Sequence, residues 1–524
     1  MEAHHEAVAN MAAQVRSFYD RKQHFRIYHG STNSTRPLRF QKDKIVDTSH
    51  LNHILKIDRL HHTVFCEPNV SMEQLYRECV KGGMVPQVVM EFPGITVGGG
   101  FAGTSGESSS FRHGFFENTV RSIEIILADG QVVKASKNER ADLLEAAAGS
   151  FGTFGVTTML EVQLMPAKSY VELDILPVNS VSTAITELEI ATQERFKNDY
   201  VDGIVYRKTL AVVITGQLRD KAMVDPAIPL ERFARPKDEW FYRYVEKQLE
   251  VDSESPFKIT VPLKDYLFRY DRGAFWGGKW AFQYFMVPFN RMTRYWLDDL
   301  MHAKVMYHAL HESNLANQNI VQDIGFPSST AEDFITYLDH DFGFYPLWLC
   351  PLMKANPNMP LRPRTGSSIG DNALSSELLI NVGVWGPGPN RQSAFVEVNR
   401  QIEKKTRELF GIKCLYARAY YTEDEFWQIY DKTWYEEMRQ KYNATTLPTV
   451  YEKTKTHIAP DEEGRIWDVW PVPGLYGAMS ALVAVYSPLR ADYVLEKQGR
   501  ALKWYQLPLL VVFAIVVRFI SRWM

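Results

Sequence analysis

The sequence is poor in cysteine and close to charge balance, and these two shortages exclude several classes of protein. Four cysteines in 524 residues, without CxxC spacing, argue against a disulfide framework or a zinc site and favour a reducing compartment. A formal net charge of -3 gives no electrostatic reason to expect a nucleic-acid partner. Two histidine pairs, His4-His5 and His61-His62, lack carboxylates at ligand spacing. They are interpreted as surface residues, and no metal site is predicted.

Long apolar runs are also scarce, with one exception near the C-terminal end. Residues 1–20 contain no apolar core of a signal peptide, and their pattern predicts an amphipathic helix. The run WYQLPLLVVFAIVVRFISRW predicts a transmembrane helix at about residues 504–522, because about twenty helical residues cover a bilayer core. A buried terminal helix or an in-plane anchor is the alternative. With a spanning helix, we expect a single-pass membrane protein of the endoplasmic reticulum whose catalytic domains face the cytosol.

A dense run of glycines and hydroxyls, FPGITVGGGFAGTSGESSS, occupies residues 92–110. Glycine permits a positive φ and a close approach of the backbone to a ligand. Successive free N–H groups in such a loop form a concave anion site, which favours a loop that holds a phosphorylated cofactor. The run has neither the Gly-Lys-Ser/Thr of a Walker A loop nor the spacing of a Rossmann fingerprint. A cluster of glycine-rich turns is the alternative at this point.

Regular elements with further glycine and hydroxyl segments surround this run. Residues 30–35 (GSTNST) and 149–155 (GSFGTFG) are two more candidate phosphate loops, although the first, taken alone, is simply a polar turn. Alternating patterns predict strands at 63–70, 85–89, 121–130, 131–135, 156–164 and 170–177, and further β-runs within 203–216. Helices are predicted at 71–83, capped by Ser71, and at 141–148 and 182–192.

These elements together resemble a known family. Their order, the glycine stretch, IEIILADGQVV and GSFGTFGVTTMLEVQL resemble the FAD-binding domain of vanillyl-alcohol-oxidase (PCMH-type) flavoproteins. The peptides ITVGGGFAGTSGESSS, YPLWLCP, LYARAYYTEDEFW and LPTVYEK resemble, more specifically, the Δ24-sterol reductase family, and the match runs to about Lys455. Familiar members carry a membrane segment at the N-terminus, whereas the apolar run here is C-terminal.

The resemblance implies an α+β fold in three parts. Residues 1–168 are expected to form a two-subdomain, PCMH-type FAD-binding domain. Residues 169–480 are expected to form a larger α+β substrate or cap domain, whose last helices can pack back on the FAD domain. Residues 481–524 are expected to form an extension with the membrane anchor.

The resemblance also implies where FAD binds. We expect the N–H groups of Gly98 to Gly100 near the pyrophosphate and Glu107 near a flavin hydroxyl. A histidine that attaches FAD covalently in many relatives corresponds to Ser31 here, so noncovalent FAD is predicted. The predicted cofactor contacts are Gly30, Ser31, Thr32, Thr96, Val97, Gly98, Gly99, Gly100, Phe101, Ala102, Gly103, Thr104, Ser105, Gly106, Glu107, Ser108, Gly152, Thr153 and Gly155.

The implied reaction saturates the C24=C25 alkene of a sterol with a hydride from reduced flavin and a proton from a protein acid. Tyr416, in the shared LYARAYY peptide, is the first candidate for that acid, followed by Tyr420 and Tyr451. Glu124 is interpreted as a structural hydrogen-bonding group. Aromatic clusters from residue 275 onward are mostly core, but some must line the pocket of a flat, apolar substrate.

NADPH is the expected electron donor, and Arg362 and Arg364 are weak candidates for its 2′-phosphate because arginine suits phosphate geometry. Three alternatives stay open. The first is an FAD-dependent alcohol or sugar oxidase of the same fold. The second is a reductase of another steroid or isoprenoid, and the third is a membrane-tethered scaffold that binds no flavin.

Overall fold

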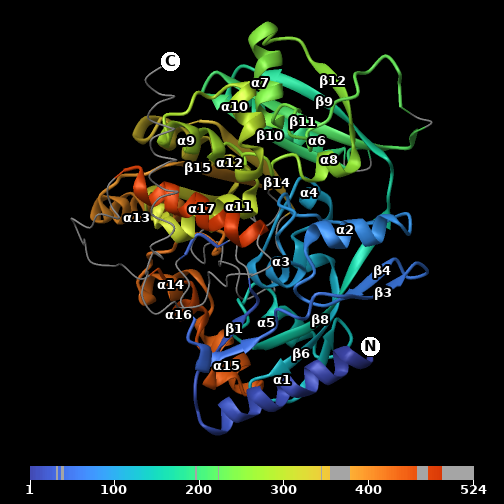
Figure 1. The fold of residues 1–524 in the computed structure, drawn as a ribbon, viewed down its shortest axis with the longest axis vertical. Helices are drawn as coiled ribbons and strands as arrows, with labels where there is room; N and C mark the ends of the chain where they lie inside the picture. The colour runs from blue at the N-terminus through green and yellow to red at the C-terminus, as the bar shows by residue number, and fades with distance from the viewer. Residues whose placement is uncertain are drawn as a thin grey trace.

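The structure of the protein is a computed structural model, and it has an α+β fold in which two sheets lie one above the other (Figure 1). It describes residues 1–30, 34–36, 40–194, 197–221, 224–343, 345–353, 378–456 and 470–486. The predicted membrane segment 504–522 lies outside these residues, as do Ser31, Thr32, Arg362 and Arg364. Within the described ranges no helix has the length and apolar character needed to cross a bilayer.

The N-terminal region is built on an antiparallel sheet with strand order β3-β4-β8-β6-β7, and β5 pairs with β8. The strands are β3 (Ile54–Asp58), β4 (Thr63–Cys66), β5 (Met84–Pro86), β6 (Val120–Leu127), β7 (Val132–Ser136) and β8 (Gly155–Pro166). A small parallel pair, β1 (Arg26–Tyr28) and β2 (Ile45–Asp47), lies beside it. The helices are α1 (Glu2–Asp20), α2 (Met72–Val80), α3 (Val97–Gly103), α4 (Ser110–His113) and α5 (Ala141–Ala147), with 3-10 turns η1 (Lys42–Lys44) and η2 (Phe116–Thr119).

In this region the structure contains the cap and the turn that the local sequence predicts. Ser71 caps α2 by accepting a hydrogen bond from the N–H of Gln74 at 3.2 Å. The Asp-Gly turn at Gly130, with φ +85°, joins β6 to β7 as a hairpin. The predicted strand at 85–89 is shorter, because only Met84–Pro86 pairs with β8. The α+β class with this N-terminal region is therefore confirmed.

The second region contains one eight-stranded sheet with order β12-β9-β11-β10-β14-β15-β13-β16, and all of its pairings are antiparallel. Its strands are β9 (Tyr170–Val178), β10 (Tyr200–Arg207), β11 (Leu210–Arg219), β12 (Phe257–Pro262), β13 (Asn319–Pro327), β14 (Leu347–Leu352), β15 (Leu379–Pro387) and β16 (Ile412–Lys413). Helices α6 (Val181–Gln193), α12 (Ser328–Asp341) and α13 (Gln392–Glu408) enclose a separate apolar core against one face of this sheet.

The other face of this sheet looks toward the N-terminal region. The segment between β11 and β13 contains α7 (Phe241–Val251), α8 (Leu263–Leu267), α9 (Gly277–Tyr284), α10 (Arg291–Trp296), η4 (Asp298–Leu300), α11 (Ala303–Ser313) and η5 (Leu315–Gln318). Phe275 and Trp276 from this segment are fully buried in the apolar core that continues into the N-terminal region. The two regions therefore share one core.

The chain then returns to the N-terminal region. This return segment, residues 414–456, contains α14 (Glu423–Ile429), α15 (Lys432–Lys441), η6 (Ala444–Thr446) and α16 (Val450–Thr454). Figure 1 shows α15 in the lower half of the molecule, next to α1, although it lies far along the chain. The Nη1 of Arg439 donates to the backbone oxygen of Thr153 at 2.9 Å. The last described helix, α17 (Val472–Tyr486), packs on α11.

Candidate functional site

A cavity of about 300 Å³ lies where the glycine stretch meets the second sheet. Its lining comes from the N-terminal region, from strands β13, β14 and β15, from α11 and from the return segment. No single region encloses this space, so the site depends on all of them.

Many of the predicted site residues line this cavity. They are Thr96, Gly98, Gly99, Ala102, Gly103, Thr104, Ser105, Gly106, Gly152, Gly155 and Tyr416. Others do not: Gly30, Val97, Gly100, Phe101, Glu107, Ser108, Thr153, Tyr420 and Tyr451. Val97 and Phe101 are apolar core residues, and Thr153 is bonded to Arg439 and Tyr435 of the return segment.

The glycine stretch is not a loop throughout, because Val97–Gly103 forms helix α3 with Thr96 as its cap. Three of the N–H groups predicted to face a pyrophosphate are already bonded within the chain. Gly98 donates to the oxygen of Pro68, Gly99 to Oγ1 of Thr96, and Gly100 to the oxygen of Thr96. These N–H groups therefore have partners within the chain, and the contact of Gly98 to Gly100 with a pyrophosphate stays a prediction.

The anion-binding backbone lies one turn further on. Thr104 ends α3 with a φ of +58°, and no group in the described part of the chain accepts the N–H of Thr104, Ser105 or Gly106. All three residues line the cavity. Successive unpaired N–H groups after a residue with positive φ form a concave anion site. At Gly106 a Cβ would lie 2.7 Å from Cδ2 of Leu352, so only glycine brings this backbone against β14.

A cluster of basic side chains, partly or fully buried, lines the same end of the cavity. Arg26 and His29 come from the β1 segment, Arg36 from the loop after it, and Lys453 from α16 of the return segment. The guanidinium of Arg36 lies 5.1 Å from the ring centre of Phe151 and donates to the oxygen of Leu415. Its Nε and the Nδ1 of His29 are buried without a hydrogen-bond partner among the described residues. We call Arg26, Arg36 and Lys453 the basic cluster.

Burial and mutual repulsion destabilise the positive charges of the basic cluster. Burial, with repulsion from Arg26, Arg36 and Arg439, lowers the pKa of Lys453 to about 7. Burial and the charge of Arg26 lower the pKa of Arg36 to about 9. Lys453 donates to the oxygen of Phe151, and no carboxylate of the described chain pairs with it. A ligand with a negative charge would stabilise all three cations.

These features fit the pyrophosphate of FAD. The free N–H groups of Thr104 to Gly106 and the unpartnered Nε of Arg36 are donors for phosphate oxygens. Lys453 and Arg26 supply charge without a protein counter-ion in the cavity lining. Residues 104–106, Arg36 and Lys453 are therefore the groups that would hold the cofactor.

The opposite end of the cavity is formed by alternate residues of three strands. On β14, Trp348 and Cys350 line the cavity while Leu347 and Leu349 belong to the core beneath α6 and α12. Asn381 and Trp385 of β15 and Asp323 of β13 face the cavity in the same way. Successive side chains of a strand point to opposite faces, which accounts for this division. Trp385 contacts Phe92 edge-on at 5.8 Å, so this end is largely aromatic.

Polar groups at this end converge on one carboxyl. The hydroxyl of Tyr416 donates to Oδ2 of Asp323 at 2.5 Å, and Nδ2 of Asn381 donates to Oδ1 at 3.0 Å. Burial raises the pKa of Asp323, and burial together with Asp323 raises the pKa of Tyr416 far above its usual range. Burial and the nearby carboxyls of Glu107 and Asp323 raise the pKa of Glu91, which also lines the cavity, to about 8. The raised pKa values of these three groups all favour their protonated forms.

The structure gives Tyr420 and Tyr451 other partners. The hydroxyl of Tyr420 lies 3.5 Å from Nη1 of Arg418, and that of Tyr451 donates to the oxygen of Tyr421 at 3.4 Å. Of the three predicted tyrosines, only Tyr416 lines the cavity. Neither Tyr420 nor Tyr451 lines the cavity, and their catalytic roles stay predictions.

Glu107 and Ser108 connect the two regions instead of facing the cavity. Oε1 of Glu107 lies 3.7 Å from Nη1 of buried Arg269, and Tyr266 donates to Oγ of Ser108 at 3.1 Å. Arg269 is held in turn by Asp202 at 2.7 Å. Glu107 does not line the cavity in this position, and its contact with a flavin hydroxyl stays a prediction.

One histidine assigned to the surface is buried. Nδ1 of His4 lies 2.8 Å from Glu67, and Nε2 lies 3.1 Å from Glu124. Hydrogen bonds to Glu124 and Glu67 raise the pKa of His4 to about 9. Glu124 also accepts a hydrogen bond from Thr158 at 2.7 Å, in agreement with its predicted structural role. His4 thus fastens α1 to the sheet.

Several lining residues were not predicted, chiefly Lys453, Arg36, Asp323, Asn381 and Glu91. Lys453 lies in the LPTVYEK peptide that supports the family resemblance, and this was its only sequence signal. Asp323 is the one charged residue of strand β13, which is a usable signal for a functional carboxyl. Arg36 and Glu91 flank the glycine segments without a distinctive pattern.

Comparison with known proteins agrees with this geometry. A family model described as "FAD binding domain" matches residues 4–136. The human Delta(24)-sterol reductase is 29% identical over 462 residues, which cover 86% of this chain and 86% of the human protein. The Delta(24)-sterol reductase of Pisum sativum is 30% identical over 458 residues, covering 80% of this chain and 78% of the relative. The rice Cytokinin dehydrogenase 9 is 33% identical over only 130 residues, 24% of this chain and 25% of that protein. The chain belongs to the Delta(24)-sterol reductase family of FAD-binding oxidoreductases.

Proposed function

We propose that the protein is an FAD-dependent Δ24-sterol reductase that saturates the C24=C25 alkene of a sterol side chain. One observation carries the proposal. A single cavity combines a basic, anion-binding end with an aromatic end that contains one hydrogen-bonded pair of acidic groups, Asp323 and Tyr416. An apolar polycycle with one reactive double bond matches such a pocket, because its walls are mostly apolar and its polar groups are few.

The chemistry of an isolated alkene explains the need for an acid. No carbonyl is present to accept charge, so hydride addition must be coupled to protonation of the neighbouring carbon. When bound and reduced by its electron donor, FAD would supply the hydride. We assign the proton to the hydroxyl of Tyr416, which delivers it to the less substituted carbon of the alkene.

Asp323 is the residue that prepares Tyr416 for this role. Its carboxyl is buried and is bonded to Tyr416 and Asn381, with no basic side chain at bonding distance in the described structure. Burial raises the pKa of Asp323, so the pair binds a proton more readily than an exposed carboxyl does. After Tyr416 gives up its proton, a proton from solvent restores the pair, and Asp323 again accepts the hydrogen bond of Tyr416 at 2.5 Å.

The aromatic residues that line the cavity can stabilise positive charge on the substrate. Protonation of one alkene carbon leaves positive character on the more substituted carbon, which then receives the hydride. Trp348, Trp385 and Tyr307 line the cavity. Aromatic faces stabilise a desolvated positive charge by about 1–2 kcal/mol each.

We further propose NADPH as the donor and a membrane location through residues 504–522. Both follow from the sequence: the first from the family resemblance and the second from the apolar run. The relevant tests are reduction of the flavin by NADPH compared with NADH, and resistance of the protein to extraction from membranes at alkaline pH.

The test of the function is an anaerobic half-reaction. The flavin of the purified protein is reduced with NADPH or dithionite and mixed with a Δ24-sterol, and the flavin absorbance is followed. We expect the absorbance to recover, with a product two mass units heavier than the sterol. A flavin that is reoxidised rapidly by oxygen but not by any Δ24-sterol contradicts the proposal and supports an oxidase.

A further inference from the structure

Exposed apolar side chains gather around helices α9 and α10. The described residues include eleven exposed large hydrophobic side chains, and five of them belong to this area. They are Met286 (57% exposed), Met292 (62%), Tyr295 (52%), Trp296 (72%) and Trp470 (44%). We call these five the aromatic surface. All the aromatic residues among the eleven are in it, so this is not the usual scatter of single exposed side chains.

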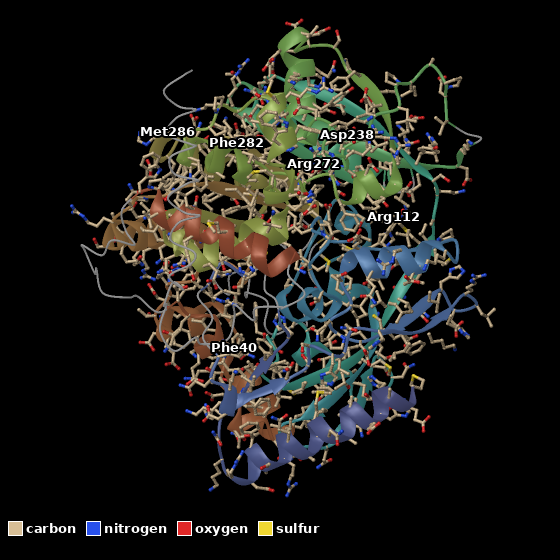
Figure 2. The ribbon with its side chains drawn as sticks, viewed as in Figure 1. Phe40, Arg112, Asp238, Arg272, Phe282 and Met286 are labelled. Atoms are coloured by element: carbon tan, nitrogen blue, oxygen red, sulfur yellow. The ribbon has the colours of Figure 1, made fainter. Side chains whose placement is uncertain are left out.

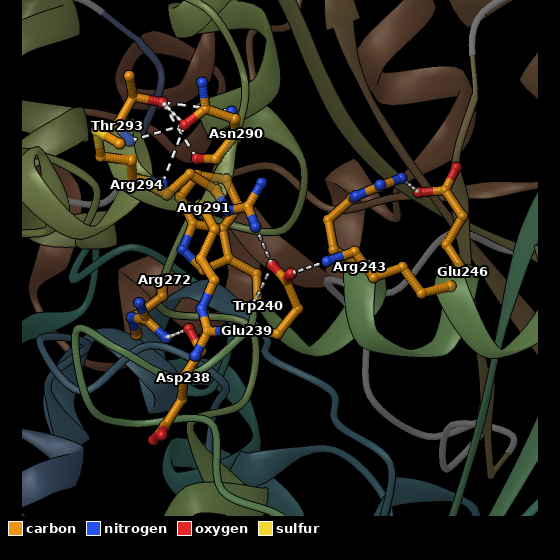
Figure 3. Close-up of polar contacts among 12 residues, drawn as sticks. Asp238, Glu239, Trp240, Arg243, Glu246, Arg272, Asn290, Arg291, Thr293 and Arg294 are labelled. Atoms are coloured by element: carbon orange, nitrogen blue, oxygen red, sulfur yellow. Dashed lines mark hydrogen bonds and ion pairs between the residues drawn. The ribbon is translucent and has the colours of Figure 1, made fainter.

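Helix α10 is held so that its apolar side faces solvent. Met292, Tyr295 and Trp296 lie on one side of the helix, because residues three and four apart are neighbours. Arg294 is buried on the other side, with Nη2 2.5 Å from Oε1 of Glu239 and its guanidinium 4.9 Å from the ring centre of Phe289 (Figure 3). Rotation of α10 to bury its aromatic residues would break this ion pair inside the protein.

The start of α10 is fixed as well. Oδ1 of Asn290 accepts the N–H groups of Met292 and Thr293, both at 3.0 Å (Figure 3). Figure 2 shows Met286 at the margin of the molecule and Phe282 further inside, and Phe282 is 2% exposed. The exposed and buried residues of this segment are thus clearly separated, and the aromatic surface is a built feature of the fold.

The aromatic surface is connected to the last described helix and to the cavity wall. Nε1 of Trp470 donates to the oxygen of Tyr284 at the end of α9, at 2.6 Å. Helix α17 follows Trp470 and packs on α11. Helix α11 carries Tyr307, which lines the cavity. Beyond α17 the chain continues through residues 487–524, which include the apolar run at 504–522.

We propose that the aromatic surface docks on a lipid membrane, with the Tyr295, Trp296 and Trp470 side chains at the level of the lipid headgroups. Trp and Tyr combine a large apolar ring with a polar tip, which suits the boundary between hydrocarbon and water. Exposed Arg291 and Asp299 lie beside the patch with opposite charges, so no strongly acidic or basic partner is specified. The apolar run that follows α17 in the chain favours a bilayer over a protein partner.

The experiment uses the full chain with an environment-sensitive fluorophore on a single introduced thiol. Met292→Cys places the probe in the aromatic surface, and Leu60→Cys, whose native side chain is 83% exposed in the N-terminal region, is the matched control. Cys66, Cys79 and Cys350 are buried, and wild type carried through the labelling measures the background from Cys414. The protein is mixed with phosphatidylcholine vesicles, and flavin content confirms that each variant is folded.

We expect the probe at 292 to shift to shorter wavelength and to be quenched by brominated phosphatidylcholine in the vesicle-bound protein, whereas the probe at 60 stays in water. A probe at 292 that remains in water on vesicle-bound protein, or a protein that does not bind vesicles, overturns the proposal. A shift without vesicles also overturns it. If that shift grows with protein concentration, a second copy covers the patch, and if it does not, the chain itself does.

A second measurement needs no label. Tryptophan fluorescence of wild type should be partly quenched by brominated vesicles, and Trp296→Ala should lose part of that quenching while keeping its flavin, because Trp470 and Trp504 remain at the bilayer. Quenching that is equal in the two proteins contradicts docking through this surface. Both readouts are independent of turnover, so they can succeed or fail separately from the proposed sterol reduction.

Discussion

The basic cluster makes a quantitative prediction about cofactor binding. With no anion present, burial and the charges of Arg26 and Arg36 hold the pKa of Lys453 at about 7. A pyrophosphate beside the amine removes this penalty and returns the pKa toward the usual value of about 10.4. Lys453 therefore binds a proton when FAD binds at a pH above 7, and hardly any when FAD binds below it.

The size of the effect follows from the two pKa values. At pH 8 about 0.1 of the Lys453 amines are protonated before binding and nearly all afterwards, so uptake of about 0.9 proton per FAD is expected. At pH 6 the expected uptake is only about 0.1 proton. By the same arithmetic the FAD dissociation constant should rise about 16-fold between pH 7.0 and pH 8.5, if no other group titrates.

The assay is titration calorimetry of apoprotein with FAD in two buffers that have different ionisation enthalpies, which counts protons directly. Lys453→Arg is the matched control, because arginine stays charged and should bind FAD without the uptake at pH 8. Lys453→Met should bind more weakly and also show no uptake. Equal uptake at pH 6 and pH 8 in wild type, or unchanged uptake in Lys453→Arg, would refute the assignment of Lys453 to the cofactor phosphate.

Three further predictions concern the acid, the glycine stretch and the N-terminal helix. Tyr416→Phe should keep its FAD but lose about 10²–10⁴-fold in the rate at which a Δ24-sterol reoxidises reduced flavin, whereas Tyr420→Phe, outside the cavity, should react as wild type does. Gly99→Glu should purify without flavin, since it adds a carboxylate to the cavity lining beside the pyrophosphate groups, and a yellow Gly99→Glu protein would show that the lining is misassigned. Because its folded pKa is raised from 6.5 to about 9, His4 stabilises the fold below pH 6.5 and loses this effect as the pH rises through 9. Thermal unfolding of wild type and His4→Gln should therefore differ by up to about 3 kcal/mol at pH 6 and much less at pH 9.5, and a pH-independent difference would contradict the ion pair.

Elements defined by local pattern were predictable from the sequence, and helix α3 shows where local pattern fails. The cap at Ser71 and the turn at Gly130 act within a few residues, so both appear in the sequence as they do in the structure. Helix α3 contains four glycines, each of which costs about 1 kcal/mol relative to alanine in a helix. It forms nevertheless, because a Cβ at Gly98 would lie 2.7 Å from Cβ of Pro68 and one at Gly100 would collide with Met90. Close packing against distant segments overrides propensity here.

The site was predictable only in part, for a similar reason. Thr104 to Gly106 are recognisable because adjacent residues in the chain provide adjacent N–H groups. The pairing of Asp323 with Tyr416 depends on β13 lying at the cavity face and on the return of the chain after residue 414. Contacts between such distant residues follow from the sheet order β14-β15-β13-β16, which no local pattern reveals.

The return segment contributes side chains to both ends of the cavity. It supplies Lys453 at the basic end and Tyr416 at the acid end. Between them, Arg36 donates to the oxygen of Leu415, and Oγ of Ser34 donates to the oxygen of Tyr416 at 2.8 Å. Arg36 therefore binds the backbone that positions the acid while its unpartnered Nε faces the site of the cofactor phosphate. The same guanidinium contacts the Leu415 backbone and is available to the cofactor phosphate. An anion that holds Arg36 in place would therefore also hold the peptide that carries Tyr416. We therefore expect cofactor binding to order the peptide that carries Tyr416, and the cavity lining is incomplete without residues 414–456, which lie outside the region matched as an FAD-binding domain.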